Sequence, residues 1–209
     1  MYRLVGVLSL LVCLGFMLGC GGITSKLVSK QEWSENYALM KGATATSPEM
    51  IDGNVRTLGE TTFPEGAQGV VGASPASEAI VTLPEKKVIR RIVIHAANLK
   101  TFGVYADKGG GDWDIIKDVK SVKSNPIELS VTTAFPTDRI RVRVLTTDDD
   151  AEVRRKERAR TGGFSRFTGS RRAEGKIYEI ELYGFKSTEE TTTQKTEDQR
   201  EKELDELLK

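Results

Sequence analysis

The 209-residue sequence holds very few of the side chains on which most catalytic and metal centres are built. It has one histidine, His95, and two cysteines, Cys13 and Cys20. No serine stands in the Gly-x-Ser-x-Gly turn that exposes the nucleophile of many hydrolases, and no glycine-rich phosphate loop is present. Acidic residues are plentiful, but the pattern places them on outward strand faces, turns and tails. The sequence therefore predicts a chain that is not an enzyme.

An excess of either charge is also lacking, because 31 lysines and arginines stand against 30 aspartates and glutamates. A chain that is neutral as a whole does not attract a polyanion or a polycation over its entire surface. Recognition by charge must therefore be regional, and nucleic acid is not expected as a partner.

The N-terminal segment accounts for both cysteines. Residues 4–18 are uncharged and apolar, too short for a bilayer-spanning helix of about 20 residues but typical of a signal peptide. Cys13 lies inside this stretch. The run Met17-Leu18-Gly19-Cys20 resembles the lipobox of bacterial lipoproteins, although Met17 stands where leucine is usual. The resemblance implies that a signal peptide, residues 1–19, is removed and that Cys20 carries a lipid.

A lipid on Cys20 would hold the chain on a membrane of the cell envelope. Two or three acyl chains anchor stably, at about 0.8 kcal/mol per buried CH₂ group. By resemblance to enterobacterial lipoproteins, Gly21 after the cysteine is compatible with the outer membrane. We therefore expect the outer membrane rather than the inner one.

Composition divides the remaining chain into a tether, a domain and a tail. Residues 20–34 are small and polar and form the tether, and residues 35–185 form the domain. Residues 186–209 are rich in Glu, Thr and Lys, and three leucines are too few for a packed face. This charged tail is predicted to be disordered or a frayed helix.

Short segments with a period of two dominate the domain and predict strands. They follow one another at short intervals with turn signals between them, which is typical of an all-β sandwich or jelly roll. Almost no helix is expected inside the domain. The predicted strands cover residues 79–83, 88–96, 102–106, 114–122, 127–133, 139–145 and 176–183.

Alternation assigns the faces of the last two strands. The aliphatic residues of 139–144 point inward and the three arginines outward, and the same logic exposes both glutamates of 178–182. Ion pairs between that arginine row and those glutamates are expected, worth about 0.2–1 kcal/mol each at a surface. The residues predicted for the core are Ile140, Val142, Val144, Tyr178, Ile180 and Leu182.

Residues 148–175 interrupt the strands as a basic loop insertion. Residues 154–172 carry eight basic side chains and one acidic one, with two phenylalanines among them. One interpretation is an anion-binding arm, since Arg pairs with phosphate or sulfate through two hydrogen bonds. The other is a solvated loop whose first part forms a short helix, and we favour it because basic runs in neutral proteins commonly only solvate the surface. The ligand-binding candidates here are Arg154, Arg155, Arg158, Arg166 and Arg171.

A constrained loop lies within residues 43–57, where Asp52-Gly53-Asn54 follows a turn at Ser47-Pro48. A carboxylate, a carboxamide, a hydroxyl and several carbonyls are closely spaced in it, and such oxygens are the ligands of Ca²⁺. Asp-Gly and Gly-Asn are also among the commonest turn dipeptides. Both a calcium loop and an ordinary tight turn fit the residues.

A set of short motifs follows in order over residues 36–184. They are Asn36-Tyr37-Ala38, Lys41-Gly42-Ala43-Thr44-Ala45-Thr46, Ile51-Asp52-Gly53-Asn54-Val55-Arg56-Thr57, Ile80-Val81-Thr82-Leu83, Ile89-Arg90-Arg91-Ile92-Val93-Ile94, Phe102-Gly103-Val104-Tyr105-Ala106, Gly111-Asp112-Trp113, Arg139-Ile140-Arg141-Val142 and Tyr178-Glu179-Ile180-Glu181-Leu182-Tyr183-Gly184. This ordered set resembles the discoidin or coagulation factor 5/8 type C domain, a galactose-binding-like β-sandwich. The resemblance implies an eight-stranded jelly roll with a five-stranded and a three-stranded sheet.

Many members of this family hold a structural Ca²⁺, and the resemblance carries its ligand positions to Asp52, Asn54, Thr57 and Glu179. Oxygen ligands of this kind suit the ion. The tryptophan usual two residues after the threonine is Gly59 here, so the loop is expected to pack differently.

Many bacterial relatives bind carbohydrate through variable loops, and the resemblance makes Phe63 a candidate for that contact. Trp113 matches a family position that packs in the core. His95 follows a strand residue and is expected at the surface or half-buried in a strand.

Together these features predict a lipid-anchored envelope module that binds carbohydrate or another envelope polymer, without catalysis. The alternative is a structural lipoprotein that docks an envelope protein through the basic loop or the tail.

Overall fold

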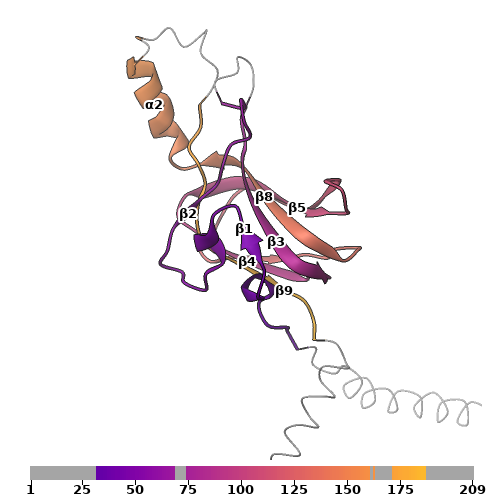
Figure 1. The fold of residues 1–209 in the computed structure, drawn as a ribbon. Coiled ribbons are helices and arrows are strands. Elements are labelled where there is room, and N and C mark those ends of the chain that lie inside the picture. The colour runs from indigo at the N-terminus through magenta and orange to yellow at the C-terminus, as the bar shows by residue number, and fades with distance from the viewer. Residues whose placement is uncertain (1–31, 69–73, 161, 163–170, 187–209) are drawn as a thin grey trace, which may run out of the picture. The chain divides into compact units, whose positions relative to one another are not determined.

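The structure, a computed structural model, describes residues 32–68, 74–160, 162 and 171–186 (Figure 1). Residues Trp33–Phe185 form one compact unit. The signal peptide, Cys20, most of the tether, nearly all of the tail and Arg166 lie outside the described residues. Within the described ranges, no helix combines the length and the apolar character needed to cross a membrane.

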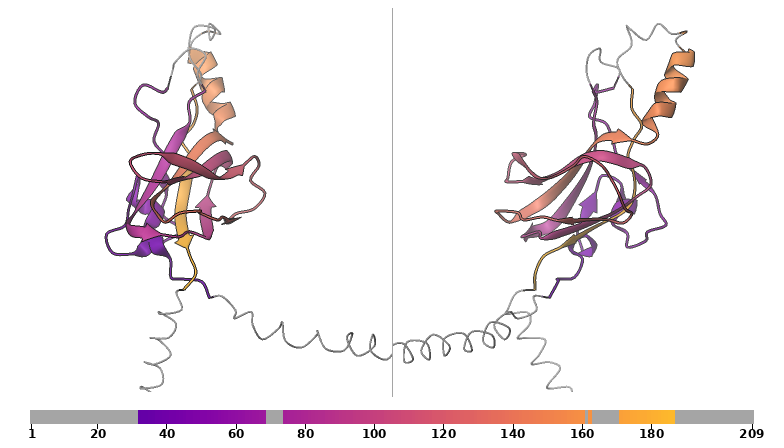
Figure 2. Two further views of the ribbon diagram at one scale, coloured as in Figure 1. Left: turned by 90° about the vertical axis from the view of Figure 1, so that its right-hand side faces the viewer. Right: turned by 180° about the vertical axis from the view of Figure 1, so that it is seen from behind.

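Two antiparallel sheets build this unit, and Figure 2 shows them from two further sides. The larger has the order β1-β3-β8-β5-β6 and the smaller the order β2-β9-β4-β7. The larger sheet consists of β1 (Thr44–Ala45), β3 (Ser77–Lys87), β8 (Thr137–Thr147), β5 (Leu99–Asp107) and β6 (Trp113–Val119). The smaller sheet consists of β2 (Gly59–Glu60), β9 (Lys176–Tyr183), β4 (Arg91–Ala96) and β7 (Ile127–Ser130).

The predicted all-β sandwich is confirmed, and the strand predicted over 176–183 matches β9 at both ends. The smaller sheet has four strands rather than three. The additional strand is β2, whose Gly59 and Glu60 pair with Ile177 and Lys176 at the start of β9.

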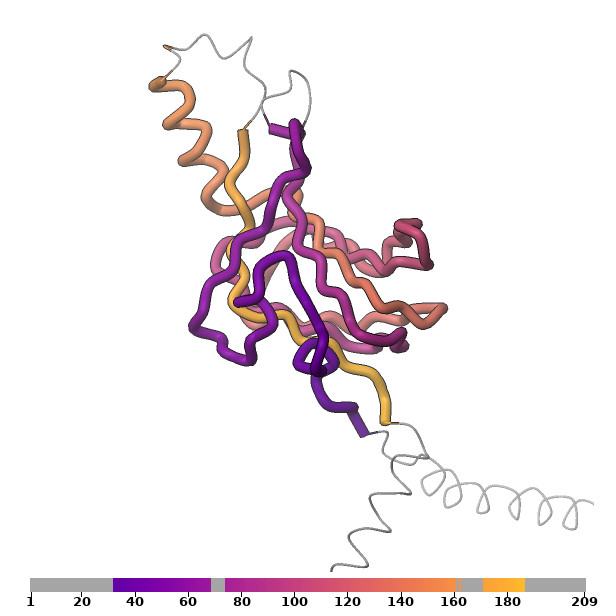
Figure 3. Tube along the Cα trace, in the orientation of Figure 1, coloured from indigo at the N-terminus to yellow at the C-terminus, as the bar shows by residue number. Residues whose placement is uncertain are grey.

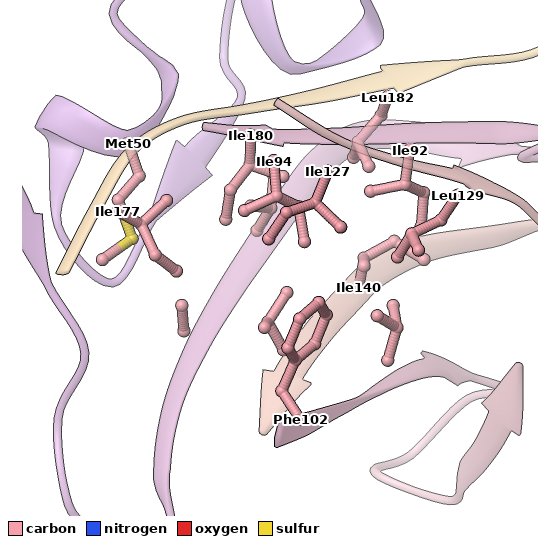
Figure 4. Packing of buried hydrophobic residues seen from close by; sticks show 14 of the residues in the cluster. Met50, Ile92, Ile94, Phe102, Ile127, Leu129, Ile140, Ile177, Ile180 and Leu182 are labelled. Carbon is pink, nitrogen blue, oxygen red and sulfur yellow. The ribbon is translucent and has the colours of Figure 1, made fainter. Parts of the chain in front are cut away.

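The core lies between the sheets and takes one face from each (Figure 4). Ile140 and Val142 of β8 are fully buried in it, as alternation predicts, and so are Ile180 and Leu182 of β9. Burying one aliphatic side chain of this size contributes about 1.5–3 kcal/mol. The cluster also takes in Met50, which anchors the loop that leads to Asp52.

A bulge in β9 changes which of its residues face inward. His95 and Ala96 of β4 pair with Glu179 and Ile177, so Tyr178 is an extra residue on β9. Tyr178 is therefore half-buried, and Glu179 is only 2% exposed. The prediction of a buried Tyr178 is wrong, because a strict period of two cannot anticipate a bulge. Glu179 pairs with His95 on the outward side of the strand, as alternation predicts, but the prediction that it is exposed is wrong because the loop around Asp52 covers it.

Three short helices accompany the sheets. Two are single 3-10 turns, η1 (Tyr37–Leu39) and η2 (Pro48–Ile51). The third, α2 (Asp150–Arg160), forms the first part of the insertion after β8, as one interpretation of that segment predicts. Figure 1 shows α2 beyond the end of the sheets.

The first and last described segments of the unit lie side by side, as the tube in Figure 3 also shows. Trp33 bridges to Phe185, and the Ser34 N–H donates to the Gly184 carbonyl at 3.1 Å. Both ends of the sandwich therefore leave it at one place.

Candidate functional site

The Asp52 loop begins where η2 ends and is held by its own polar side chains. Asp52 Oδ1 accepts a hydrogen bond of 2.8 Å from the Asn54 N–H, and Asp52 Oδ2 accepts one of 2.7 Å from Thr57 Oγ1. The Thr57 hydroxyl also lies 2.8 Å from the Asn54 carbonyl oxygen. Gly53, with φ at 76°, permits the left-handed turn between them. The loop thus gathers a carboxylate, a hydroxyl and a carbonyl within hydrogen-bond range.

Glu179 reaches this loop from the last strand, 126 residues away in sequence. Its Oε2 accepts a hydrogen bond of 3.1 Å from the Gly53 N–H, whereas its buried Oε1 has no partner among the described residues. Burial, the main cause, raises the pKa of Glu179 from an ordinary 4.5 to about 7, and the Asp52 carboxylate adds to the rise. A buried carboxylate oxygen without a donor is costly unless a proton or a cation satisfies it.

The structure therefore brings Asp52, Asn54, Thr57 and Glu179 together, and their oxygens fit a hard cation. The Asn54 carboxamide turns away, because its Oδ1 accepts from the Arg56 N–H at 3.1 Å, so its carbonyl would be the ligand atom. Among the described residues, no cluster contains three or more His, Cys, Asp or Glu side chains placed to hold a metal. A cation here would depend on hydroxyl and carbonyl oxygens besides two carboxylates, which Ca²⁺ accepts.

A second polar feature covers the outer face of the five-stranded sheet. The Arg141 guanidinium on β8 lies 4.9 Å from the ring centre of Tyr105 and 4.4 Å from that of Trp113. Arg139 lies 5.0 Å from the same Trp113 ring. We name this group, with Arg143, the aromatic–arginine face. Trp113 is half-buried on it, so the prediction that Trp113 packs in the core is wrong.

The arginine row of β8 finds its acidic partners within its own sheet. Arg139 pairs with Asp107 at 3.1 Å, while Arg141 and Arg143 share Glu78 at 3.5 and 3.6 Å. The predicted pairs with the glutamates of β9 do not form, because β8 and β9 belong to different sheets.

The lone histidine lies on the four-stranded sheet. His95 is half-buried on β4, as expected, and its Nε2 lies 3.1 Å from Glu181 Oε1. The Tyr183 hydroxyl donates to the other oxygen of Glu181 at 2.5 Å. Burial, followed by the bond to Glu181, raises the pKa of Tyr183 to about 12. His95 and Tyr183 thus each engage one oxygen of the Glu181 carboxylate, and the three side chains lie on the surface of the sheet.

The basic insertion is rooted in the sandwich by a buried carboxylate. Asp150 accepts hydrogen bonds from the Thr147 hydroxyl and N–H at 3.2 Å each and from the Ala173 N–H at 3.0 Å. Its Oδ2 also pairs with Arg172 at 3.2 Å, and Arg172 bonds the Leu145 carbonyl. Both legs of the insertion are therefore held on the end of β8.

Three of the predicted arginines share one face of α2. Arg154, Arg155 and Arg158 line a hollow of about 280 Å³ together with Ala151. Arg171 is exposed on the return leg. Phe63 is half-buried in the loop between β2 and β3, and it makes no stacking contact with a ring or a cation in the described part of the chain. The structure thus unites the helix arginines but does not join them to Phe63.

Comparison with known proteins gives structural likeness only. No family model matches the chain, and no curated protein matches it. Chitosan-binding module 1 of a chitosanase/glucanase from Paenibacillus sp. IK-5 is similar at 18% identity and a TM-score of 0.48, covering 72% of this chain and all of that one (100%). The family 32 carbohydrate-binding module of NanJ from C. perfringens, solved with galactose, is similar at 16% and 0.46, covering 72% and 98%.

A third similar structure is the family 32 module of AlyQ with 4,5-unsaturated mannuronic acid, at 12% identity and a TM-score of 0.45, covering 71% and 98%. At such identities and scores, neither a ligand nor a site residue transfers to this chain.

The sequence alone does not predict the aromatic–arginine face as a site. The alternation of 139–144, the tyrosine of β5 and the tryptophan of β6 are nevertheless visible in the sequence.

Proposed function

We propose that this chain is a non-catalytic module of the cell envelope that binds a carbohydrate polymer. The observation that carries the proposal is the pair of aromatic side chains, Tyr105 and Trp113, on the outer face of an open sheet. Ring faces carry partial negative charge, and the C–H groups on the flat side of a sugar carry partial positive charge, so the two stack. Side chains that offer hydrogen bonds beside such rings fix the sugar's orientation.

The arrangement of the titratable groups favours binding over catalysis. Glu179, whose pKa is raised, lies against the Asp52 loop, and the histidine on β4 is engaged by Glu181. Glu179 is moreover only 2% exposed. A catalytic carboxylate or histidine would need access to a bound substrate.

The envelope location rests on the sequence around Cys20. In this proposal the thiol carries lipid and the tether leads to the sandwich, with the outer membrane as the expected site. Replacing Cys20 with alanine should shift the protein from the membrane fraction to the soluble one. Retention of the Cys20→Ala protein in membranes would contradict lipid anchoring.

A bound Ca²⁺ is the second part of the proposal, as a structural ion. Asp52, Glu179, the Thr57 hydroxyl and the Asn54 carbonyl would hold it, and the unpartnered Glu179 Oε1 supports the fit. The ion would join the first loop of the sandwich to its last strand.

The test of carbohydrate binding is a glycan array that spans neutral and acidic sugars, probed with the full chain in detergent. Saturable binding to at least one class is the expected result. Silence across the whole array, with folding verified by circular dichroism, would refute the proposal.

A protein-docking function is the alternative, and the rooting of α2 favours it. Helix arginines on a fixed base could meet an acidic surface of an envelope protein. Replacing Arg154, Arg155 and Arg158 with glutamine leaves Asp150 and Arg172 intact, so the sandwich should keep its stability. Loss of a crosslinked partner in this variant would support docking, and an unchanged partner would count against it.

A further inference from the structure

We propose that the aromatic–arginine face is the binding site of an acidic polysaccharide. The sugar rings would lie on Trp113 and Tyr105, and their carboxylate or sulfate groups would pair with the arginines of β8. This inference rests on the proposed carbohydrate-binding function and specifies its site and its ligand class.

Trp113 lies against arginines of a strand that is not its neighbour in the sheet. It belongs to β6, at the edge of the sheet, and β5 separates it from β8. Its ring nevertheless lies within 5.0 Å of the guanidinium groups of Arg139 and Arg141 on β8. The Trp113 ring and the two guanidinium groups therefore meet over β5, and this half-buried ring is part of the outer surface.

Tyr105 is kept flat in the same surface by the glycine two residues before it. A Cβ at Gly103 would lie 2.9 Å from Tyr105 Cε2 and 3.2 Å from the Tyr105 hydroxyl oxygen. The ring thus occupies the space that a side chain at position 103 would take. A ring held in this way offers a stacking surface with little loss of side-chain entropy on binding.

The arginines supply the charged contacts at regular spacing. Arg139, Arg141 and Arg143 alternate along β8, so their Cα atoms are about 7 Å apart. Their side chains are 38%, 18% and 45% exposed. A straight row of this kind matches a chain that repeats its anionic groups better than it matches a single sugar.

Hydrogen-bonding capacity remains in this row. Arg143 is 45% exposed, and its one ion pair among the residues that the structure describes is the 3.6 Å contact to Glu78. Planar guanidinium groups bind carboxylate and sulfate through paired hydrogen bonds, which favours an anionic ligand over a neutral one.

The carboxylates near the arginines are engaged by them or lie at the sheet edge. Asp107 is 2% exposed and is engaged by Arg139 and by the N–H groups of Gly109 and Gly111. Glu78 is divided between two arginines. Asp118 of β6 lies opposite Gly103 at the sheet edge, so three carboxylates stand against three arginines, and the partly exposed guanidinium groups of Arg139 and Arg143 are the ones open to an anionic ligand.

The experiment is affinity electrophoresis of the full chain in detergent, which measures how far a polysaccharide in the gel retards the protein. The gels contain polygalacturonate as the carboxylate probe, dextran sulfate as the sulfate probe, or dextran as the neutral control. The variants are Trp113→Ala and Arg143→Gln, and the matched controls are Trp33→Ala and Arg90→Gln, an exposed tryptophan and a half-buried arginine elsewhere on the domain. Arg143 is exposed enough for its variant to fold even where Trp113→Ala does not.

We expect retardation by one or both acidic polymers and none by dextran. Each site variant should weaken that binding by about tenfold or more, as is usual for aromatic and arginine anchors, while the two controls bind as the unaltered chain does. Equal retardation by dextran, or acidic binding unchanged in Arg143→Gln, would overturn this inference but leave carbohydrate binding in place. Failure of the unaltered chain to bind any glycan of the array would instead refute the proposed function itself.

Discussion

The Gly53 N–H donates a hydrogen bond of 3.1 Å to Oε2 of Glu179, so a carboxylate that is 2% exposed joins the first loop of the sandwich to its last strand. The second oxygen of that carboxylate has no partner among the described residues. This relationship makes the stability of the domain depend on what satisfies Glu179, a proton or a cation.

Calcium should raise the melting temperature of the protein through this site. A ligand that binds only the folded state at 100 times its Kd adds about 2.7 kcal/mol, which corresponds to about 5–10 °C for a chain of this size. Differential scanning calorimetry in Ca²⁺ and in EDTA measures the shift. Glu179→Gln should lose it and the exposed Glu35→Gln should keep it. Identical melting in Ca²⁺ and EDTA would contradict a structural calcium site.

Without calcium, stability should fall as pH rises from about 4.5 to about 7. Burial raises the pKa of Glu179 to about 7, so the folded protein holds its proton more tightly than the unfolded chain. The contribution is complete below pH 4.5 and is lost as pH passes the folded-state value, amounting to at most about 3 kcal/mol. Urea unfolding in EDTA at several pH values tests this. The slope of the unfolding free energy against pH should flatten in Glu179→Gln. An equal slope in that variant would show that other groups cause the pH dependence.

The effect of pH on stability and the effect of calcium on stability are linked. A cation displaces the proton from Glu179, so calcium should bind more tightly at pH 8 than at pH 6. Isothermal titration at the two pH values, with proton release read from buffers of different ionisation enthalpy, checks the direction. Tighter binding at the lower pH would rule out Glu179 as a ligand.

Asp150→Ala should destabilise the domain by about 3 kcal/mol, because it leaves Arg172 and two backbone N–H groups without their buried acceptor. The exposed neighbour Asp148 offers a matched control, since within the described part of the chain its only ion pair is with Lys100 at 4.0 Å. Asp148→Ala should change stability by less than about 0.5 kcal/mol. Equal effects in urea unfolding would show that Asp150 does not root the insertion.

Gly103→Ala should disturb the aromatic–arginine face while leaving the core intact. The added Cβ would lie 2.9 Å from Tyr105 Cε2, so the ring must lift from the sheet, at a cost of about 1–2 kcal/mol. Combined with Tyr105→Ala, the same change should cost less than the sum of the two, because the clash disappears. Strict additivity in unfolding experiments would show that the ring does not lie over Gly103.

The sequence predicted most of the sandwich because its strands alternate strongly. Ile140, Val142 and Val144 were placed in the core by period alone, and each is buried. Glu179 shows the limit of that method: alternation gives its outward face, but not the loop around Asp52 that covers it, and only the family resemblance pointed to the glutamate.

The partners of the arginines were missed for a different reason. Alternation within one strand gives the face of Arg141 but not the identity of the neighbouring strands, which depends on the order β3-β8-β5-β6. That order, fixed by long-range pairing, lets the Trp113 ring and the arginine side chains meet over β5, so an expected core residue is part of a surface.

The central claim is that carbohydrate lies on the outer face of the five-stranded sheet. The most direct measurement is a titration of the isotope-labelled chain with polygalacturonate and dextran sulfate fragments, followed by two-dimensional ¹H–¹⁵N NMR. We predict that the Trp113 indole N–H and backbone amides of β5, β6 and β8 shift together and saturate. Saturable shifts confined to α2 or to the Asp52 loop, with Trp113 unmoved, would contradict the account.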